Sequence, residues 1–268
     1  LLYDSSGYVF VTTLTSGLHY FHINQQQAKT RPYFKDAAGE VFDGFIQSIT
    51  GRGDQFWLGS QDRLVRWNSR TGEASFPPLQ IKNGPVLRGR ETIRVVSLHE
   101  NQLWVGTSRY GVLVCDTNAN LRYQLFDAAD GLPSFWINSI LHDQEGNTWI
   151  GTARGLCVLR KGAKKASSFA QHPTLAPLAR YNITRMMMDR SNRLWVGSGN
   201  GAWVFDTRDS SLKNYSAKDG LISNTVLAMA EDLQGNIYFA TDRGISILGT
   251  NKQIKSFDRS NGLRNDRC

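Results

Sequence analysis

The pattern of apolar and polar residues repeats along the chain. In most copies an aromatic residue is followed two positions later by a small residue and then by Thr or Ser, as in Trp149-Ile150-Gly151-Thr152. Six copies align, with anchors that recur every 43 to 47 residues: Phe10, Trp57, Trp104, Trp149, Trp195 and Tyr238. Alternate residues of a strand point to opposite faces. Each copy therefore predicts a strand whose aromatic ring and glycine share a buried face.

The same predicted elements surround each aromatic strand. An apolar segment such as 137–143 precedes it, and a turn rich in Asp, Gly and Asn, such as 143–147, joins the two. Asp accepts local backbone hydrogen bonds, and Gly and Asn tolerate positive φ, so this turn predicts a hairpin. A third strand begins at a glycine, as in 155–158, and a more polar fourth strand, as in 121–126, completes the repeat.

The segment that precedes the aromatic strand is ambiguous in two copies. The apolar residues of 222–233 and of 183–188 fit a helical stripe as well as a strand. Periodicity alone does not separate the two for short apolar runs. The alignment with the other copies favours a strand, so we predict that each of these segments is the innermost strand of its repeat.

Four short antiparallel strands in each repeat have the size of a β-propeller blade. Stacked blades bury both faces of such a sheet. We therefore predict an all-β propeller of four-stranded antiparallel blades, about six of them, forming one domain over residues 1–268. The chain begins and ends within a repeat, which indicates a piece of a longer protein. A closed six-bladed ring, a seven-bladed propeller and a double propeller all remain open.

Composition and motifs exclude several classes of function. The chain has 31 Lys and Arg against 23 Asp and Glu, a net charge of +8, but the basic residues are scattered, so no nucleic-acid partner is expected. No run of eighteen apolar residues predicts a membrane span. The sequence has no G-x-S-x-G, H-E-x-x-H or Walker motif, and His19 and His22 fall on opposite faces of a predicted strand. We expect no catalytic residue, cofactor or metal site.

Arginines recur in the loops between the second and third strands. In an antiparallel blade these loops emerge on the same face as the connections to the next blade, which include the long segments 76–90 and 162–180. Arginine in a concave mouth binds carboxylate, sulfate or phosphate groups, and exposed aromatic rings stack on sugars. The predicted ligand-binding residues are Arg63, Arg109, Tyr110, Arg154, Arg243, Trp136, Arg88 and Arg90. The alternative is that each arginine pairs with a nearby acid, such as Asp62 or Asp242.

The best-formed repeat resembles a known family. It runs from Gly131-Leu132-Pro133-Ser134 through Asp143, Gly146-Asn147 and Trp149-Ile150-Gly151-Thr152 to Gly155-Leu156, and it resembles the two-component regulator propeller repeat. The resemblance covers almost the whole chain. It implies the periplasmic sensor region of a bacterial inner-membrane signalling protein, whose output is a histidine kinase or a diguanylate cyclase. It also implies an oligosaccharide ligand and a homodimer of the intact receptor, with membrane contact only through segments outside this chain.

We therefore predict a non-catalytic, ligand-sensing propeller that binds a small molecule or oligosaccharide, with an anionic ligand favoured by the arginines. Two alternatives remain open. A propeller enzyme of the streptogramin-lyase type would need a histidine and an acidic metal partner that converge on the mouth. A protein-interaction platform would present a flat face lined with aromatic residues.

Overall fold

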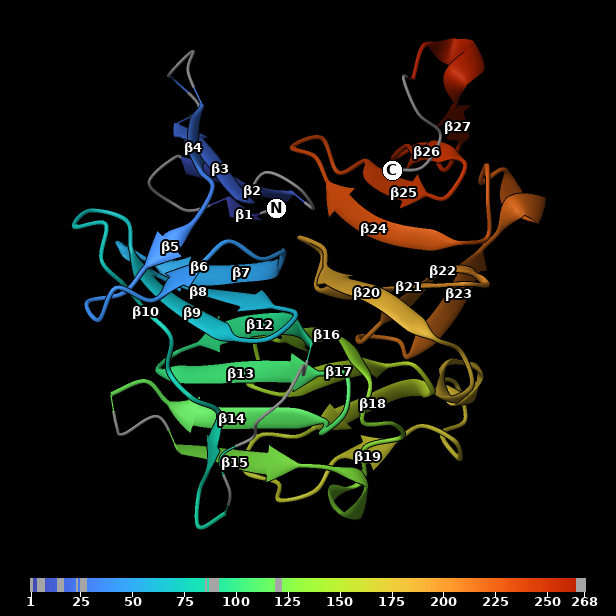
Figure 1. Ribbon diagram of the computed structural model, residues 1–268. Coiled ribbons are helices and arrows are strands. Elements are labelled where there is room, and N and C mark those ends of the chain that lie inside the picture. The colour runs from blue at the N-terminus through green and yellow to red at the C-terminus, as the bar shows by residue number, and fades with distance from the viewer. Residues whose placement is uncertain are drawn as a thin grey trace. The chain divides into compact units, whose positions relative to one another are not determined.

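The computed structural model describes residues 2–3, 8–13, 17–22, 24, 28–84, 86, 92–118 and 122–263. It confirms the predicted fold class: the chain is a β-propeller of six small four-stranded antiparallel sheets, each of which is one blade. Figure 1 shows the four strands of each blade lying side by side. The helices of the described residues are 3₁₀ turns of three or four residues: η1 (Ala128–Asp130), η2 (Ala176–Ala179), η3 (Ala217–Asp219) and η4 (Arg259–Asn261).

The chain folds as two compact units. Unit 1 comprises residues 1–127 and 135–137, and it contains the first three blades. Their strands are β1 (Leu2–Tyr3), β2 (Tyr8–Thr13), β3 (Gly17–His22) and β4 (Lys29–Arg31); β7 (Ile46–Arg52), β8 (Gln55–Ser60), β9 (Leu64–Asn68) and β10 (Ala74–Ser75); and β12 (Ile93–His99), β13 (Gln102–Thr107), β14 (Val112–Asp116) and β15 (Arg122–Phe126). Two additions accompany them. The hairpin of β5 (Phe34–Lys35) and β6 (Val41–Phe42) precedes the second blade, and β11 (Gln80–Ile81) pairs in parallel with β15.

Unit 2 comprises residues 128–134 and 138–268. It contains the last three blades, apart from the first residue of β16, which belongs to unit 1. Their strands are β16 (Ile137–His142), β17 (Thr148–Thr152), β18 (Gly155–Leu159) and β19 (Ser167–Ser168); β20 (Ile183–Met188), β21 (Arg193–Ser198), β22 (Gly201–Asp206) and β23 (Ser211–Tyr215); and β24 (Val226–Glu231), β25 (Ile237–Thr241), β26 (Gly244–Leu248) and β27 (Ile254–Phe257).

The two segments with ambiguous periodicity are strands, as the alignment predicted: they form β20 and β24. Their helix-like spacing has a physical cause. Each contains a β-bulge, and the pairing register shifts between Ile183 and Arg185 in β20 and between Val226 and Ala228 in β24. A bulge inserts one extra residue into the alternation. Buried residues such as Ile183 and Met186 then lie three positions apart on one face, which is also the signature of a helix.

The aromatic anchors are core residues, as predicted. Phe10 and the four anchor tryptophans are buried, and Tyr238 is half-buried. The nearby glycine admits the next inner strand: a Cβ added to Gly59 would lie 2.5 Å from Ile93 Cγ2, and one added to Gly151 would lie 2.6 Å from Ile183 Cγ2. The paired positions of ring and glycine therefore let successive blades approach closely within each unit.

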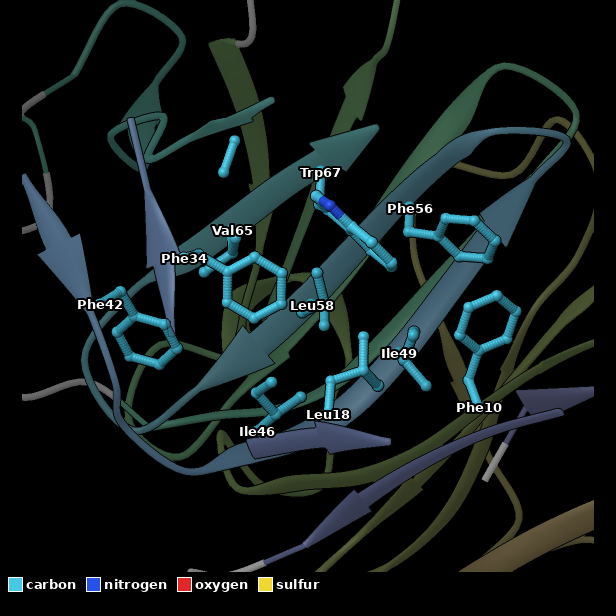
Figure 2. Packing of buried hydrophobic residues seen from close by; sticks show 11 residues of the cluster. Phe10, Leu18, Phe34, Phe42, Ile46, Ile49, Phe56, Leu58, Val65 and Trp67 are labelled. Carbon is cyan, nitrogen blue, oxygen red and sulfur yellow. The ribbon is translucent and has the colours of Figure 1, made fainter. Parts of the chain in front are cut away.

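The first two blades share one core in unit 1. Figure 2 shows Phe10 and Leu18 packed with Phe56, Leu58 and Trp67 of the second blade, while Phe34 and Phe42 come from the additional hairpin. The ring centroids of Phe34 and Trp67 are 5.7 Å apart. The β5–β6 hairpin is thus fixed to the second blade by buried aromatic rings, a feature that the repeat alignment did not predict.

The segment 162–180 is not the free connecting loop that the spacing predicted. It contains the fourth strand of its blade, β19, and the turn η2. Phe169, Leu175 and Leu178 are buried in the core of unit 2, and the Phe169 ring stacks on the anchor Trp149 with centroids 5.7 Å apart. These three apolar residues attach the segment to the core of unit 2, where they pack in one cluster with Trp149.

Candidate functional site

Arg154 and Arg243 each lie in the loop between the second and third strands of their blade. In both loops a threonine hydroxyl fixes the backbone. Thr152 Oγ1 accepts a hydrogen bond from the Arg154 N–H at 3.1 Å and donates to the Gly155 carbonyl at 2.8 Å. Thr241 Oγ1 makes the same two bonds with Arg243 and Gly244, at 3.1 and 2.7 Å. The backbone of each loop is therefore held rigidly while the arginine side chain extends from its tip.

Three of the predicted arginines have no ion-pair partner among the acids that the structure describes. Arg109, Arg154 and Arg243 are exposed, and none of their guanidinium groups forms an ion pair with a residue that the structure describes. Asp242, the acid suggested as a partner for Arg243, is also exposed and makes no ion pair with it. The pairing alternative is therefore not realised at these three loops.

Arg63 behaves differently. It occupies the position that Gly155 takes in the fourth blade, since Ser60 Oγ accepts from its N–H at 3.1 Å and donates to its carbonyl at 3.0 Å. Its guanidinium pairs with Glu40 and, at 3.5 Å, with Asp62. Burial lowers the pKa of Arg63, but the hydrogen bond to Glu40 and the charge of Asp62 outweigh that effect and the pKa is raised. At Arg63 the pairing alternative is realised.

Unit 1 brings Arg109 and Tyr110 next to the segment of Phe135 and Trp136. The N–H of Gly111, at the end of the arginine loop, donates to the Phe135 carbonyl at 3.1 Å. Phe135 and Trp136 are 56% and 42% exposed, which is unusual for rings of this size. The loop and the aromatic segment together form one surface that carries a positive charge beside exposed aromatic rings.

Arg94 joins this surface, and the sequence analysis missed it. Its guanidinium carbon lies 4.8 Å from the centroid of the Trp136 ring, a cation–π contact. Partial burial lowers the pKa of Arg94 from its ordinary value. Arg94 is the extra residue of the bulge between Ile93 and Val95 in β12, and its side chain therefore departs from the alternation of the strand. The three-residue spacing of buried apolar residues that such a bulge leaves in an inner strand, as at Ile183 and Met186, was the sequence signal that could have identified it.

The remaining predicted residues are distributed as follows. Arg154 and Arg243 lie on two separate loops of unit 2, whereas Arg63, Arg109, Tyr110 and Trp136 belong to unit 1. Arg88 and Arg90 lie outside the described residues. Within the described chain no group of three His, Cys, Asp or Glu side chains could hold a metal ion. His19 Nδ1 and His142 Nδ1 each lie 3.0 Å from a threonine hydroxyl oxygen.

Three cavities lie at the opposite ends of the strands from the arginine loops. The first, of about 540 Å³, is in unit 1 against the second blade. Two others, of about 420 and 360 Å³, occupy comparable positions on the third and sixth blades. Each is lined by an amide side chain at the start of the aromatic strand: Gln55 and Gln102 are the first residues of β8 and β13, and Asn236 directly precedes β25. In the part of the chain described here, no helix has the length and apolar character needed to cross a membrane.

No family model and no curated protein matches the chain, whereas solved structures do. The extracellular domain of the hybrid two-component system BT4673 from B. thetaiotaomicron is 17% identical with a TM-score of 0.77, over 99% of this chain and 34% of that one. The corresponding domain of BT3049 from B. thetaiotaomicron is 18% identical with a TM-score of 0.60, over 98% and 47%. A streptogramin B lyase is 12% identical with a TM-score of 0.60, over 83% and 70%.

At these identities the likeness shows a shared propeller fold. The chain spans about a third of the length of the first solved structure and about half of the second. Extracellular domains of hybrid two-component systems are thus among the structural neighbours of this chain, and they are the kind of protein that the repeat resemblance named. The lyase shares the same architecture, so the fold by itself does not separate a sensor from an enzyme.

Proposed function

We propose that this chain is a ligand-sensing propeller in the extracytoplasmic part of a bacterial membrane-bound signalling receptor, and that it is not itself catalytic. The fold of the extracellular two-component domains and the repeat resemblance both support this role. In the proposal the intact receptor is an inner-membrane protein whose kinase or cyclase region lies outside this chain, and it acts as a homodimer.

The observation that carries the proposal is the surface of unit 1 formed by Arg94, Arg109, Tyr110, Phe135 and Trp136. The Arg109 guanidinium is exposed and forms no ion pair with any described residue, so it is available for an anionic group. The exposed rings of Phe135 and Trp136 offer apolar faces to a sugar ring. We therefore infer a small-molecule or oligosaccharide ligand that carries a carboxylate or sulfate.

The loops of unit 2 repeat part of this chemistry. Arg154 and Arg243 each extend from a loop whose backbone is fixed by a threonine hydroxyl. Arginine presents five N–H donors in a planar fork that matches a carboxylate or sulfate. In the proposal these two arginines bind further anionic groups of the same class of ligand.

The test begins with a thermal-shift screen of the protein against neutral and acidic oligosaccharides. An acidic oligosaccharide should raise the melting temperature, and calorimetry should then show that Arg109→Ala and Trp136→Ala each weaken its binding by about tenfold or more. Neither substitution should lower the melting temperature of the free protein by more than a few degrees, because both side chains are substantially exposed.

The matched control is Arg52→Ala. Arg52 is also an exposed arginine of unit 1, but it lies at the hairpin between β7 and β8, away from the arginine loops. It should leave the affinity unchanged. An equal loss of binding in Arg52→Ala and Arg109→Ala would show that the effect comes from the net charge of the protein and not from the proposed site. Unchanged binding in Arg109→Ala would contradict the proposed site.

A further inference from the structure

The cavity of about 540 Å³ on the second blade is not used by the proposed function. It lies where β8 begins and β9 ends, and the residues that line it include Lys35, Asp36, Gln55, Arg66, Asn68 and Glu73. Cavities of roughly 300–1,000 Å³ are those that hold small molecules. Most such cavities are lined by apolar side chains, whereas six of the residues around this one are charged or carry an amide, so it offers the groups that bind a polar ligand.

The β5–β6 hairpin builds one wall of this cavity. Phe34 is 1% exposed and packs on Trp67, as Figure 2 shows. Alternation along the strand places Lys35 on the face opposite to Phe34. The next residue, Asp36, forms a parallel bridge with Ala74 of β10. A buried aromatic ring and a strand bridge thus hold Lys35 and Asp36 against the second blade.

The other wall is the second blade itself. Arg66 of β9 has its guanidinium carbon 5.5 Å from the centroid of the Trp57 ring, which supports the side chain. Glu73 precedes β10, and one of its carboxylate oxygens, Oε2, accepts the Thr71 hydroxyl at 3.0 Å. Asp36 is held in a similar way, since its Oδ1 accepts the Glu40 N–H at 2.8 Å. Each carboxylate is therefore oriented by a bond to one of its two oxygens.

The charges of this cavity do not pair with one another. Among the residues that the structure describes, no ion pair joins Lys35 or Arg66 to Asp36 or Glu73. Arg63, which contacts the same additional hairpin, does pair with two acids. Two cations and two carboxylates in one cavity, held apart from one another, present a bipolar surface to whatever enters.

The two amides add a second kind of recognition. Gln55 Nε2 donates to the Trp67 carbonyl at 3.0 Å, which leaves its Oε1 as an acceptor. Asn68 Oδ1 accepts the N–H groups of Arg70 and Thr71, each at 2.9 Å, which leaves its amide nitrogen as a donor. One acceptor and one donor are what the N–H and C=O of a peptide bond require.

We propose that this cavity binds a dipeptide-sized zwitterion. Its carboxylate is bound by Arg66 and Lys35, and its ammonium group by Asp36 and Glu73, while Gln55 and Asn68 contact the peptide unit. Arginine matches a carboxylate with paired N–H donors, and an ammonium group offers three donors to carboxylate acceptors. A ligand with only a positive charge would leave Arg66 and Lys35 without a partner, and one with only a negative charge would leave Asp36 and Glu73 without one.

The experiment is calorimetric titration of the protein with alanylalanine, its N-acetyl derivative, its C-terminal amide and free alanine. Acetylation removes the positive charge and amidation removes the negative charge, so each derivative should bind at least about tenfold more weakly than alanylalanine. Free alanine, which keeps both charges but lacks the peptide unit, should also bind more weakly. No binding of alanylalanine at millimolar concentration, or equal binding of all four compounds, would overturn the proposal.

Two substitutions assign the charges. Arg66→Gln should weaken alanylalanine by about tenfold or more but leave the affinity of the amide unchanged, because the amide lacks the group that Arg66 binds. Glu73→Gln should also weaken alanylalanine by about tenfold or more but leave the affinity of the N-acetyl derivative unchanged, because that derivative lacks the ammonium group that Glu73 binds. The matched control is Lys255→Gln, in the cavity of the sixth blade, whose lining residues include no carboxylate. A comparable loss in Lys255→Gln, or equal effects on the charged and capped ligands, would contradict the assignment.

Discussion

The first hairpin of a blade is built differently in the three blades of unit 2 and in the second and third blades, which belong to unit 1. In unit 2 a four-residue turn that follows an aspartate joins the inner strand to the aromatic strand, and this aspartate also holds the anchor ring. Asp143 Oδ2 accepts the Trp149 Nε1–H at 2.9 Å, and Asp189 Oδ2 accepts that of Trp195 at 2.8 Å. In the sixth blade Asp232 Oδ2 accepts the Tyr238 hydroxyl at 3.2 Å.

The second and third blades, which belong to unit 1, achieve the same strand pairing without such an aspartate. The turns are two residues long, between Arg52 and Gln55 in the second blade and between His99 and Gln102 in the third. The comparison shows that burial of the ring is common to both kinds of blade, whereas a bond between turn and ring occurs, among the hairpins that the structure describes, in the blades of unit 2. Removing a ring should therefore destabilise either kind of blade, whereas replacing a turn residue should be costly in the blades of unit 2 and mild in the second and third blades.

Loss of an anchor ring should be the largest effect. Trp149→Ala removes a buried ring, and we expect the free energy of unfolding to fall by about 3–5 kcal/mol. Chemical denaturation measures it. Trp149→Phe keeps an aromatic ring but removes the indole hydrogen bond, so it separates the two contributions to stability. It should lower the free energy of unfolding more than Trp57→Phe does, because the Trp57 indole donates to no residue that the structure describes. A neutral Trp149→Ala would show that the ring is not buried.

Loss of a turn aspartate should come next. Asp189 is fully buried at its side chain and accepts four hydrogen bonds, from the N–H of Ser191, the N–H and Nε of Arg193, and the Trp195 indole. Asp189→Ala should lower the free energy of unfolding by about 2–3 kcal/mol, since hydrogen bonds to a charged group are the strong ones. Asp54→Ala is the matched control in a turn of unit 1, where the exposed ion pair with Arg70 is worth less than about 1 kcal/mol.

A weaker, pH-dependent effect should follow from Asp232. The hydrogen bond from the Asn236 amide lowers the pKa of Asp232, and the N–H groups of Asn236 and Gln234 and the Tyr238 hydroxyl act in the same direction. A lowered pKa in the folded state stabilises the protein above the ordinary aspartate pKa of about 3.9, and this contribution is lost as the pH falls through the folded value.

Denaturation of the wild type and of Asp232→Asn measures this contribution. Their difference in unfolding free energy should be complete at neutral pH and should shrink as the pH falls below about 4. A difference that stays constant into strong acid would show that the charge of Asp232 has no part in holding the turn.

The smallest effect should be a gain of stability in unit 1. Glu100, in the turn between β12 and β13, has a φ of 51°, and Gly53 has a φ of 58° in the equivalent turn of the second blade. Glycine adopts this conformation without steric cost, so Glu100→Gly should raise the free energy of unfolding by about 0.5–1 kcal/mol. A loss of stability would indicate that the Glu100 side chain makes a compensating interaction.

The sequence predicted the repeated features because each blade supplies an independent copy of them. The position of Trp149 beside Gly151 recurs, and so does the Asp143 turn, although the bond from that aspartate to the ring six residues later was not foreseen. The unique features escaped prediction. The β5–β6 hairpin occurs once among the described strands, and the pairing of Arg63 with Glu40 joins residues 23 positions apart.

The candidate site was predicted in part for the same reason. Arg109, Arg154 and Arg243 follow from the repeat, but their lack of ion pairs with described residues depends on side-chain directions that no local pattern encodes. Arg94 was missed because a bulge takes its side chain out of the strand alternation. The charged cavity was missed because Lys35 and Arg66 line it from two different elements, the additional hairpin and the second blade, which no local pattern brings together.

The most direct test of the account is the melting temperature of two variants. The triple variant Arg109→Ala, Arg154→Ala, Arg243→Ala should melt within about one degree of the wild type, because these exposed arginines form no ion pair with any residue that the structure describes. Arg63→Ala removes two ion pairs and contacts with two rings, and it should lower the melting temperature by at least about 2–4 °C, the shift that 1 kcal/mol causes in a protein of this size. A triple variant that melts as low as Arg63→Ala would show that the loop arginines are structural, and it would contradict the proposed ligand site.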